Sequence, residues 1–103
     1  MKILLVCSAG MSTSLVVEKM KKALTPEEAS SVIHAIAAEN FEDEFSEYDV
    51  VLLGPQLKFR KGDLGKIAAT KGIPLDVINM MDYGTLQGAK ILDFARKLYQ
   101  SKN

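Results

Sequence analysis

The sequence predicts an α/β fold, an open four-stranded parallel sheet flanked by helices in three layers. Two observations carry this prediction. Four short apolar segments alternate with longer amphipathic ones, which is the order that βαβ units produce along a chain. After their first residue, segments 2–6 and 49–53 contain only apolar side chains, as is typical of central parallel strands covered on both faces. The chain has 103 residues, of which 48% are hydrophobic, so a single domain over residues 1–103 is expected.

The four expected strands are Lys2 to Val6, Ser31 to Ala37, Asp49 to Leu53 and Pro74 to Ile78. The second of these leaves an alternative open. The run Thr25-Pro26-Glu27-Glu28 has the pattern of a capping box with proline at the first helical position, so a helix over residues 27–40 would also fit. A strand after a short turn is favoured because the β-branched residues Val32, Ile33 and Ile36 suit a pleated sheet.

Three longer helices are expected, at Ser12 to Leu24, Leu57 to Thr70 and Thr85 to Tyr99, together with a short helical turn at Glu39 to Ser46. In the first and third of these, apolar residues recur at helical spacing and charged residues take the other face. In the last helix the inward-facing side chains are expected to be Leu86, Ala89, Leu92, Ala95, Leu98 and Tyr99. The methionines expected to fill the core are Met20, Met80 and Met81.

Charge and cysteine content argue against several classes of protein. The 13 basic and 13 acidic residues cancel, whereas a chain that coats nucleic acid normally carries a basic excess, so no nucleic-acid partner is expected. Cys7 is the only cysteine, which forbids an internal disulfide and indicates a reducing compartment. The apolar run Ile3 to Cys7 is far below the roughly 18 residues that a membrane span needs, so a cytoplasmic protein is expected.

The segment between the first strand and the first helix carries the candidate chemistry. Ligands of parallel α/β sheets bind beyond the carboxyl ends of the strands, which here means Cys7 to Ser14, Gly54 to Arg60 and Asn79 to Gly84. The side-chain-free Gly10 lets backbone N–H groups curl around an anion, and the start of the following helix favours negative charge. The same donors favour a thiolate at Cys7. The hydroxyl donors of this loop are Ser8, Ser12, Thr13 and Ser14.

Other kinds of site find little support in the sequence. A lone cysteine is more often a small buried hydrophobe than a nucleophile, and here it is the small, polar run after Cys7 that favours chemistry. There is no G-x-x-x-x-G-K-[ST] or G-x-G-x-x-G motif for a nucleotide or dinucleotide. His34, the only histidine, has no ligand spacing to Cys7, so neither a metal nor another cofactor is expected, and His34 is given no role in phosphotransfer.

Low-molecular-weight tyrosine phosphatases resemble this layout, with a strand, a Cys-x5-Arg-Ser/Thr loop and then a helix. Here Thr13 stands where their arginine would be, and no arginine lies in the loop. Their general acid comes from an Asp-Pro loop, and the nearest feature here is Asp82, which no proline follows. A thiol that binds phosphate without a bidentate clamp or an acid indicates a carrier rather than a hydrolase. A small cysteine phosphatase or arsenate reductase remains the alternative.

Two stretches carry a closer resemblance, ILLVCSAGMSTSLVV at residues 3–17 and DVVLLGPQ at residues 49–56. They resemble the IIB component of the bacterial sugar phosphotransferase system, in its lactose/N,N′-diacetylchitobiose/cellobiose family. The resemblance implies that Cys7 accepts a phosphoryl group from a histidine of a IIA protein. It also implies transfer to a sugar, expected to be a disaccharide of the cellobiose or chitobiose type, on a membrane IIC protein.

The resemblance further implies which groups hold the phosphate and where the chain works. The cradle would be formed by the backbone amides of Ser8, Ala9, Gly10, Met11, Ser12, Thr13 and Ser14. Apart from the resemblance, Gln56 follows the third strand at the end of the sheet that borders the cradle, so Gln56 and Tyr83 are expected at its rim; a plain turn is the alternative for the Gln56 segment, and a half-buried core position is the commoner role for such a tyrosine. The cations that could steer a phosphoprotein partner are Lys58, Arg60 and Lys61. Transient docking at the inner face of the cell membrane follows from the IIC partner.

Overall fold

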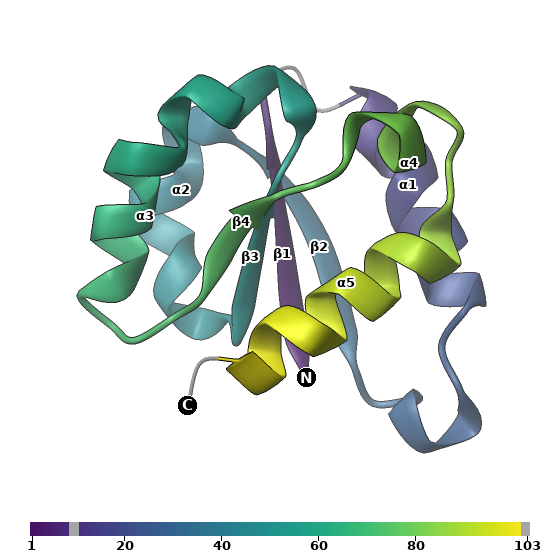
Figure 1. Ribbon diagram of the computed structural model, residues 1–103. Coiled ribbons are helices and arrows are strands. Elements are labelled where there is room, and N and C mark those ends of the chain that lie inside the picture. Colours follow the sequence, from purple (N-terminus) through teal and green to yellow (C-terminus); the bar gives the residue numbers. More distant parts are fainter. Residues whose placement is uncertain (9–10, 102–103) are drawn as a thin grey trace.

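The computed structural model describes residues 1–8 and 11–101 and contains one sheet of four parallel strands in the order β2-β1-β3-β4 (Figure 1). The strands are β1 (Lys2–Cys7), β2 (Val32–Ala37), β3 (Val50–Leu53) and β4 (Leu75–Val77). Each lies within one residue of its predicted bounds, and the predicted α/β class is confirmed. Among residues 1–8 and 11–101, no helix combines the length and apolar character needed to cross a bilayer.

Helices cover both faces of the sheet (Figure 1). One face packs against α1 (Met11–Lys22) and α5 (Gly88–Ser101), and the other against α2 (Phe41–Glu44) and α3 (Lys61–Ala69). The remaining helical elements are short: α4 (Met80–Gly84) and the 3₁₀ turns η1 (Pro26–Glu28), η2 (Ala38–Asn40), η3 (Phe45–Glu47) and η4 (Pro55–Arg60). The turn predicted at residues 39–46 is therefore present as η2, α2 and η3.

Both faces of the central strands are buried. Their side chains are therefore apolar on both faces. On β1, Ile3 and Leu5 belong to the core under α1 and α5, whereas Leu4 and Val6 belong to the core under α2 and α3. All four are fully buried. Because side chains alternate along a strand, Cys7 lies on the same face as Ile3 and Leu5, the face that α1 covers.

The order of the strands creates a reversal beside β1. The chain leaves β1 through α1 to reach β2 on one side, and then returns past β1 through α2 to reach β3 on the other. Such a reversal opens a crevice at the carboxyl ends of the two strands that flank it, which is where ligands of open α/β sheets bind. Cys7 ends β1, and Gly54 follows β3, with its N–H donating to the carbonyl of Val6 at 2.8 Å. The fold therefore brings Cys7 and Gly54 together at this end of the sheet.

The structure decides the alternative at residues 25–40 in favour of a strand after a short turn. Thr25 and Glu28 form the predicted capping box, with the Thr25 N–H donating to Glu28 Oε1 at 3.0 Å, but the helix stops after the single turn η1. The chain then pairs with β1 in parallel, starting at Val32 opposite Lys2. Sheet pairing of the β-branched residues outweighs the local helix signal.

Several expectations about the helices and the methionines are wrong. The final helix begins at Gly88 rather than Thr85, because Leu86 takes a left-handed conformation with φ of 55° and ends the preceding turn. Its buried side includes Ile91, while Ala89 is exposed and Tyr99 is 36% exposed.

Met80 and Met81 are 66% and 72% exposed, because the short α4 turns Tyr83 inward instead; Met20 is buried as expected. The poorer helix predicted at residues 57–70 is divided between η4 and α3.

A partly buried ion pair joins η1 to α5, and it should make the free energy of unfolding depend on pH. Arg96 Nε donates to Glu28 Oε2 at 2.8 Å, and Arg96 Nη2 donates to Glu28 Oε1. The hydrogen bonds from Arg96, and after them the backbone N–H of Thr25, lower the pKa of Glu28 from 4.5 to about 2. A carboxyl whose pKa is lowered by folding stabilises the protein above its unfolded pKa, and that contribution is lost as pH falls through the folded value.

We therefore expect Glu28→Gln to be less stable than the parent at pH 7, with the difference shrinking as pH falls from about 4.5 towards 2. Urea unfolding at a series of pH values measures this difference. Glu27→Gln, at the exposed neighbouring position, is the matched control and should follow the parent throughout. A difference between Glu28→Gln and the parent that stays constant down to pH 2 would contradict the assignment.

Candidate functional site

Cys7 is the last residue of β1 and only 2% exposed. Its position is set by the sheet, because Cys7 pairs in register with Ala37 of β2. Helix α1 begins at Met11, so its first turn follows Cys7 closely. The first N–H groups of a helix have no partner within it, and the positive end of the helix dipole lies there. Cysteine is a side chain that acts as a nucleophile in other proteins, and here Cys7 lies where a strand ends and a helix begins.

The predicted cradle is described only in part. Ala9 and Gly10 lie outside the described residues, as do the side chains of Met11, Ser12 and Thr13, whose backbones form the first turn of α1. Ser8 is exposed directly after Cys7. The Ser14 side chain is exposed and lines a groove of about 470 Å³ between α1 and β2, together with Val17, Glu18, Lys21, Ile33, His34 and Ala35. The ring of His34 is exposed there and stacks on Tyr48, at 6.5 Å between ring centroids.

Gln56 reaches the neighbourhood of Cys7 through the space above Gly54. A Cβ atom placed on Gly54 would lie 2.7 Å from Gln56 Oε1 and 3.7 Å from Cys7 Cβ. The Gln56 carboxamide is thus folded back over Gly54, next to the residue that ends β1. Gln56 is exposed while Gly54 is buried, so the carboxamide lies at the boundary between the crevice and solvent.

Tyr83 and the predicted steering cations are placed differently. Tyr83 is 8% exposed and belongs to the core between the sheet, α1 and α5, which is the commoner role expected for it. Arg60 pairs with Asp63 at 2.9 Å, and Lys61 pairs with Asp76 at 3.0 Å. The hydrogen bond from Arg60 lowers the pKa of Asp63. The charges of Arg60 and Lys61 are therefore partly neutralised within the chain.

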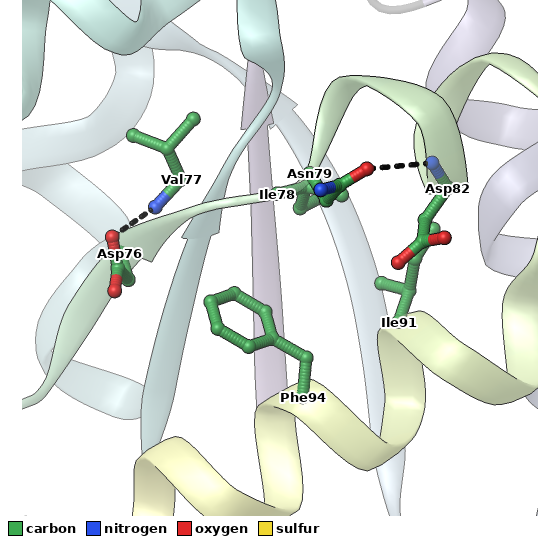
Figure 2. A pocket seen from close by; sticks show the side chains of 7 residues that line it. All are labelled: Asp76, Val77, Ile78, Asn79, Asp82, Ile91 and Phe94. Carbon is green, nitrogen blue, oxygen red and sulfur yellow. Dashed lines mark hydrogen bonds between the residues drawn. The ribbon is translucent and has the colours of Figure 1, made fainter.

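A second hollow, of about 290 Å³, lies between β4, α4 and α5, and its lining includes Asn79 and Asp82 of the segment expected to bind ligands after the last strand (Figure 2). Two of its polar side chains, those of Asn79 and Asp76, accept hydrogen bonds from backbone N–H groups. Asn79 Oδ1 caps α4 by accepting from the N–H groups of Met81 and Asp82 at 2.8 and 3.1 Å. Asp76 Oδ1 accepts from the N–H of Val77 at 2.7 Å. Ile91 and Phe94 of α5 supply its apolar wall.

Exposed apolar side chains gather on the segments that follow the strands. Among the described residues, the large hydrophobic side chains that stand exposed on these segments are Leu15 of α1, Phe59 of η4, and Met80 and Met81 of α4. These segments follow the carboxyl ends of β1, β3 and β4, the end of the sheet at which Cys7 lies (Figure 1). Singly exposed apolar side chains are common on protein surfaces; these four share one end of the sheet.

Comparison with known proteins gives a consistent result. The sequence model of the family described as "PTS system, Lactose/Cellobiose specific IIB subunit" matches residues 2–94. Two relatives from Lactococcus lactis are each 43% identical over 101 residues, covering 93% of this chain and 94% of the relative. They are the galactose-specific EIIB component of subspecies cremoris and the cellobiose-specific EIIB component of subspecies lactis.

A solved structure gives the same family as these relatives. The solution structure of the cellobiose-specific phosphotransferase IIB component from Borrelia burgdorferi matches with a TM-score of 0.80 and 43% identity. The match covers 100% of this chain and 94% of that one. The residues matched by the family, 2–94, include Cys7, the loop after it and the segment from Gly54 to Gln56.

Proposed function

Because this chain belongs to the lactose/cellobiose-specific IIB subunits of the sugar phosphotransferase system, we propose that Cys7 is the residue that carries its phosphoryl group. The observation that supports this most directly is the position of Cys7, at the end of β1, in the crevice of the strand reversal and just before α1 begins. The carrier is a single IIB domain over residues 1–103.

The proposed reaction is two successive in-line displacements. The Cys7 thiolate attacks the phosphorus of a phosphohistidine on the IIA partner; the S–P bond forms, the P–N bond breaks, and the histidine nitrogen keeps the electron pair. A sugar hydroxyl held by the IIC partner then attacks the same phosphorus. The O–P bond forms, the S–P bond breaks and returns the thiolate, and a base on the IIC side accepts the hydroxyl proton.

The proposed cradle has to hold the charge that the first step creates. A phosphorylated side chain carries close to two negative charges at neutral pH, and a single favourable contact with a helix dipole contributes only about 0.3–1 kcal/mol. Several donors must therefore act together. The backbone amides of Ser8, Ala9, Gly10, Met11, Ser12, Thr13 and Ser14 are the proposed set.

Partners and substrate follow from the same proposal. The exposed apolar side chains at the Cys7 end of the sheet support contact with a IIA donor, which has to approach this end to reach the thiol. The IIC partner would bring the chain transiently to the inner face of the membrane. The proposed sugar is a disaccharide of the cellobiose or chitobiose type, a class to which one of the two equally similar relatives is assigned by name.

Mass spectrometry tests the assignment of Cys7. After incubation with phosphoenolpyruvate, the general phosphotransferase proteins and a cognate IIA protein, the intact chain should gain one phosphoryl group. Peptide mapping should locate it at Cys7. A phosphoryl group found on another residue would refute the proposal.

The phosphatase alternative has a separate test. The family match already favours the carrier, and the loop contains no arginine with which to clamp a transferring group. The chain alone should therefore release no more than a trace of product from an aryl phosphate. Sustained turnover without any partner protein would instead indicate a hydrolase.

A further inference from the structure

The glycine at position 54 matters for the space that its missing side chain leaves, and not for its backbone conformation. Its φ of −61° and ψ of 152° form an extended conformation that any L-residue adopts. A Cβ here would meet Val6 O at 3.5 Å and Cys7 Cβ at 3.7 Å, which are ordinary contacts, but Gln56 Oε1 at only 2.7 Å. The one atom that a side chain at position 54 would displace therefore belongs to Gln56.

We propose that Gln56 is a phosphoryl-contacting residue, held beside Cys7 by the space above Gly54, whose carboxamide N–H donates to the phosphoryl group on Cys7. The inference rests on the proposed function of Cys7 and extends it to a donor from another strand end. A primary amide has an acceptor oxygen and two N–H donors at one end, so a half-turn about its last torsion exchanges them. No bond to Gln56 forms or breaks in either displacement.

The chemistry of a carrier suits a neutral donor at this place. Hydrogen bonds to or from charged groups are roughly twice as strong as those between neutral groups, and a bidentate arginine clamps phosphate. A carrier must release its phosphoryl group as readily as it accepts it. The carboxamide adds a donor to a loop that lacks arginine without adding a positive charge that would hold the group back.

The geometry predicts that substitutions at Gln56 and Gly54 have coupled effects on phosphoryl transfer, which a double-mutant cycle measures. Gln56→Ala removes the donor, and Gly54→Ala leaves the donor in the chain but displaces it. Both should shift the equilibrium distribution of the phosphoryl group between IIA and this chain about tenfold towards IIA, the loss of one hydrogen bond to a charged group. In the Gln56→Ala background, adding Gly54→Ala should change that distribution less than about twofold.

Phosphoryl distribution is measured by mass spectrometry of equilibrated mixtures of IIA and the variant. Gln56→Glu, which brings a carboxylate to the phosphoryl group, should shift the distribution further than Gln56→Ala. Gln100→Ala is the matched control, because Gln100 is an exposed glutamine on the last turns of α5. The parent, the two single variants and the double variant are also unfolded in urea: Gly54→Ala should cost little stability, because the atom that its methyl group displaces is the end of the flexible Gln56 side chain.

Two results would overturn the inference. One is a Gln56→Ala chain whose phosphoryl distribution equals that of the parent and of Gln100→Ala. The other is full additivity of the Gly54→Ala and Gln56→Ala shifts. Both are distinguishable from failure of the proposed function, in which the parent chain itself would carry no phosphoryl group on Cys7.

Discussion

Gly88→Ala is expected to lower the free energy of unfolding by about 3 kcal/mol, since it forces a methyl group into backbone that cannot give way. A Cβ at position 88 would lie 2.6 Å from Lys19 Cβ and nearer still to the Lys19 carbonyl group. Lys19 lies within α1, and Gly88 is the first residue of α5, so the contact sets how closely the two helices approach. Relief requires one helix to move off the sheet face that both of them cover.

Urea or thermal unfolding measures this effect, and two other glycines provide controls. A Cβ on Gly62 or Gly84 would meet nothing within 4 Å. Gly62 is exposed in the first turn of α3, and Gly62→Ala should raise stability by about 0.5–1 kcal/mol, because alanine favours helix over glycine. Gly84→Ala, at the end of α4, should change it little. Equal stabilities of the Gly84→Ala and Gly88→Ala chains would contradict the close approach of α1 and α5.

Cys7→Ser is expected to lower phosphoryl transfer to sugar by about a thousandfold or more, which makes it the largest functional effect on the chain. A serine hydroxyl is almost entirely protonated at neutral pH, whereas the thiolate is the attacking species in the proposed reaction. The measurement is sugar phosphate formed per chain in a mixture with the general phosphotransferase proteins, IIA and membranes that contain IIC.

The control for this substitution is stability. Cys7 is 2% exposed, and serine is nearly the same size as cysteine, so the Cys7→Ser chain should keep its fold and compete with the parent for IIA. Inhibition of the parent reaction by an excess of Cys7→Ser would show that docking survives while transfer is lost. Undiminished sugar phosphorylation by the Cys7→Ser chain would remove Cys7 from the reaction.

The sheet could be predicted from the sequence because its strands are buried on both faces and bounded by turn residues. Continuous apolar runs such as Val50–Leu53 occur in central parallel strands and are too short for buried helices. The start of the last helix could not be predicted in the same way. It depends on the left-handed Leu86, and no glycine or proline marks that residue in the sequence.

The methionine error has a related cause. A helix of five residues, such as α4, is too short to show a periodic apolar face, so sequence pattern does not separate its buried Tyr83 from its exposed Met80 and Met81. By contrast, the amphipathic pattern of α1 correctly placed Met20 in the core. Pattern is informative where an element is long enough to repeat it.

In the candidate site, too, features set by local sequence could be predicted, and the contacts of individual side chains could not. Cys7 was predicted because strand, small-residue loop and helix follow one another within the chain. The contact between Gln56 and the space above Gly54 is local, but the closeness of both residues to Cys7 depends on the pairing of β1 with β3, which joins residues far apart in the sequence. A Gly-Pro-Gln run is locally typical of a turn; its place after another parallel strand predicts Gln56 at the rim, but not that its carboxamide folds back over Gly54.

The small accessible area of Cys7 has a kinetic consequence. In the proposed reaction, a IIA donor and then a IIC acceptor must each reach this largely buried sulfur at the end of β1. The donor must then dissociate before the acceptor binds. In that interval only this chain would shield the proposed S–P bond from hydrolysis, so the lifetime of the isolated phosphorylated form would limit how long delivery to the sugar can be delayed.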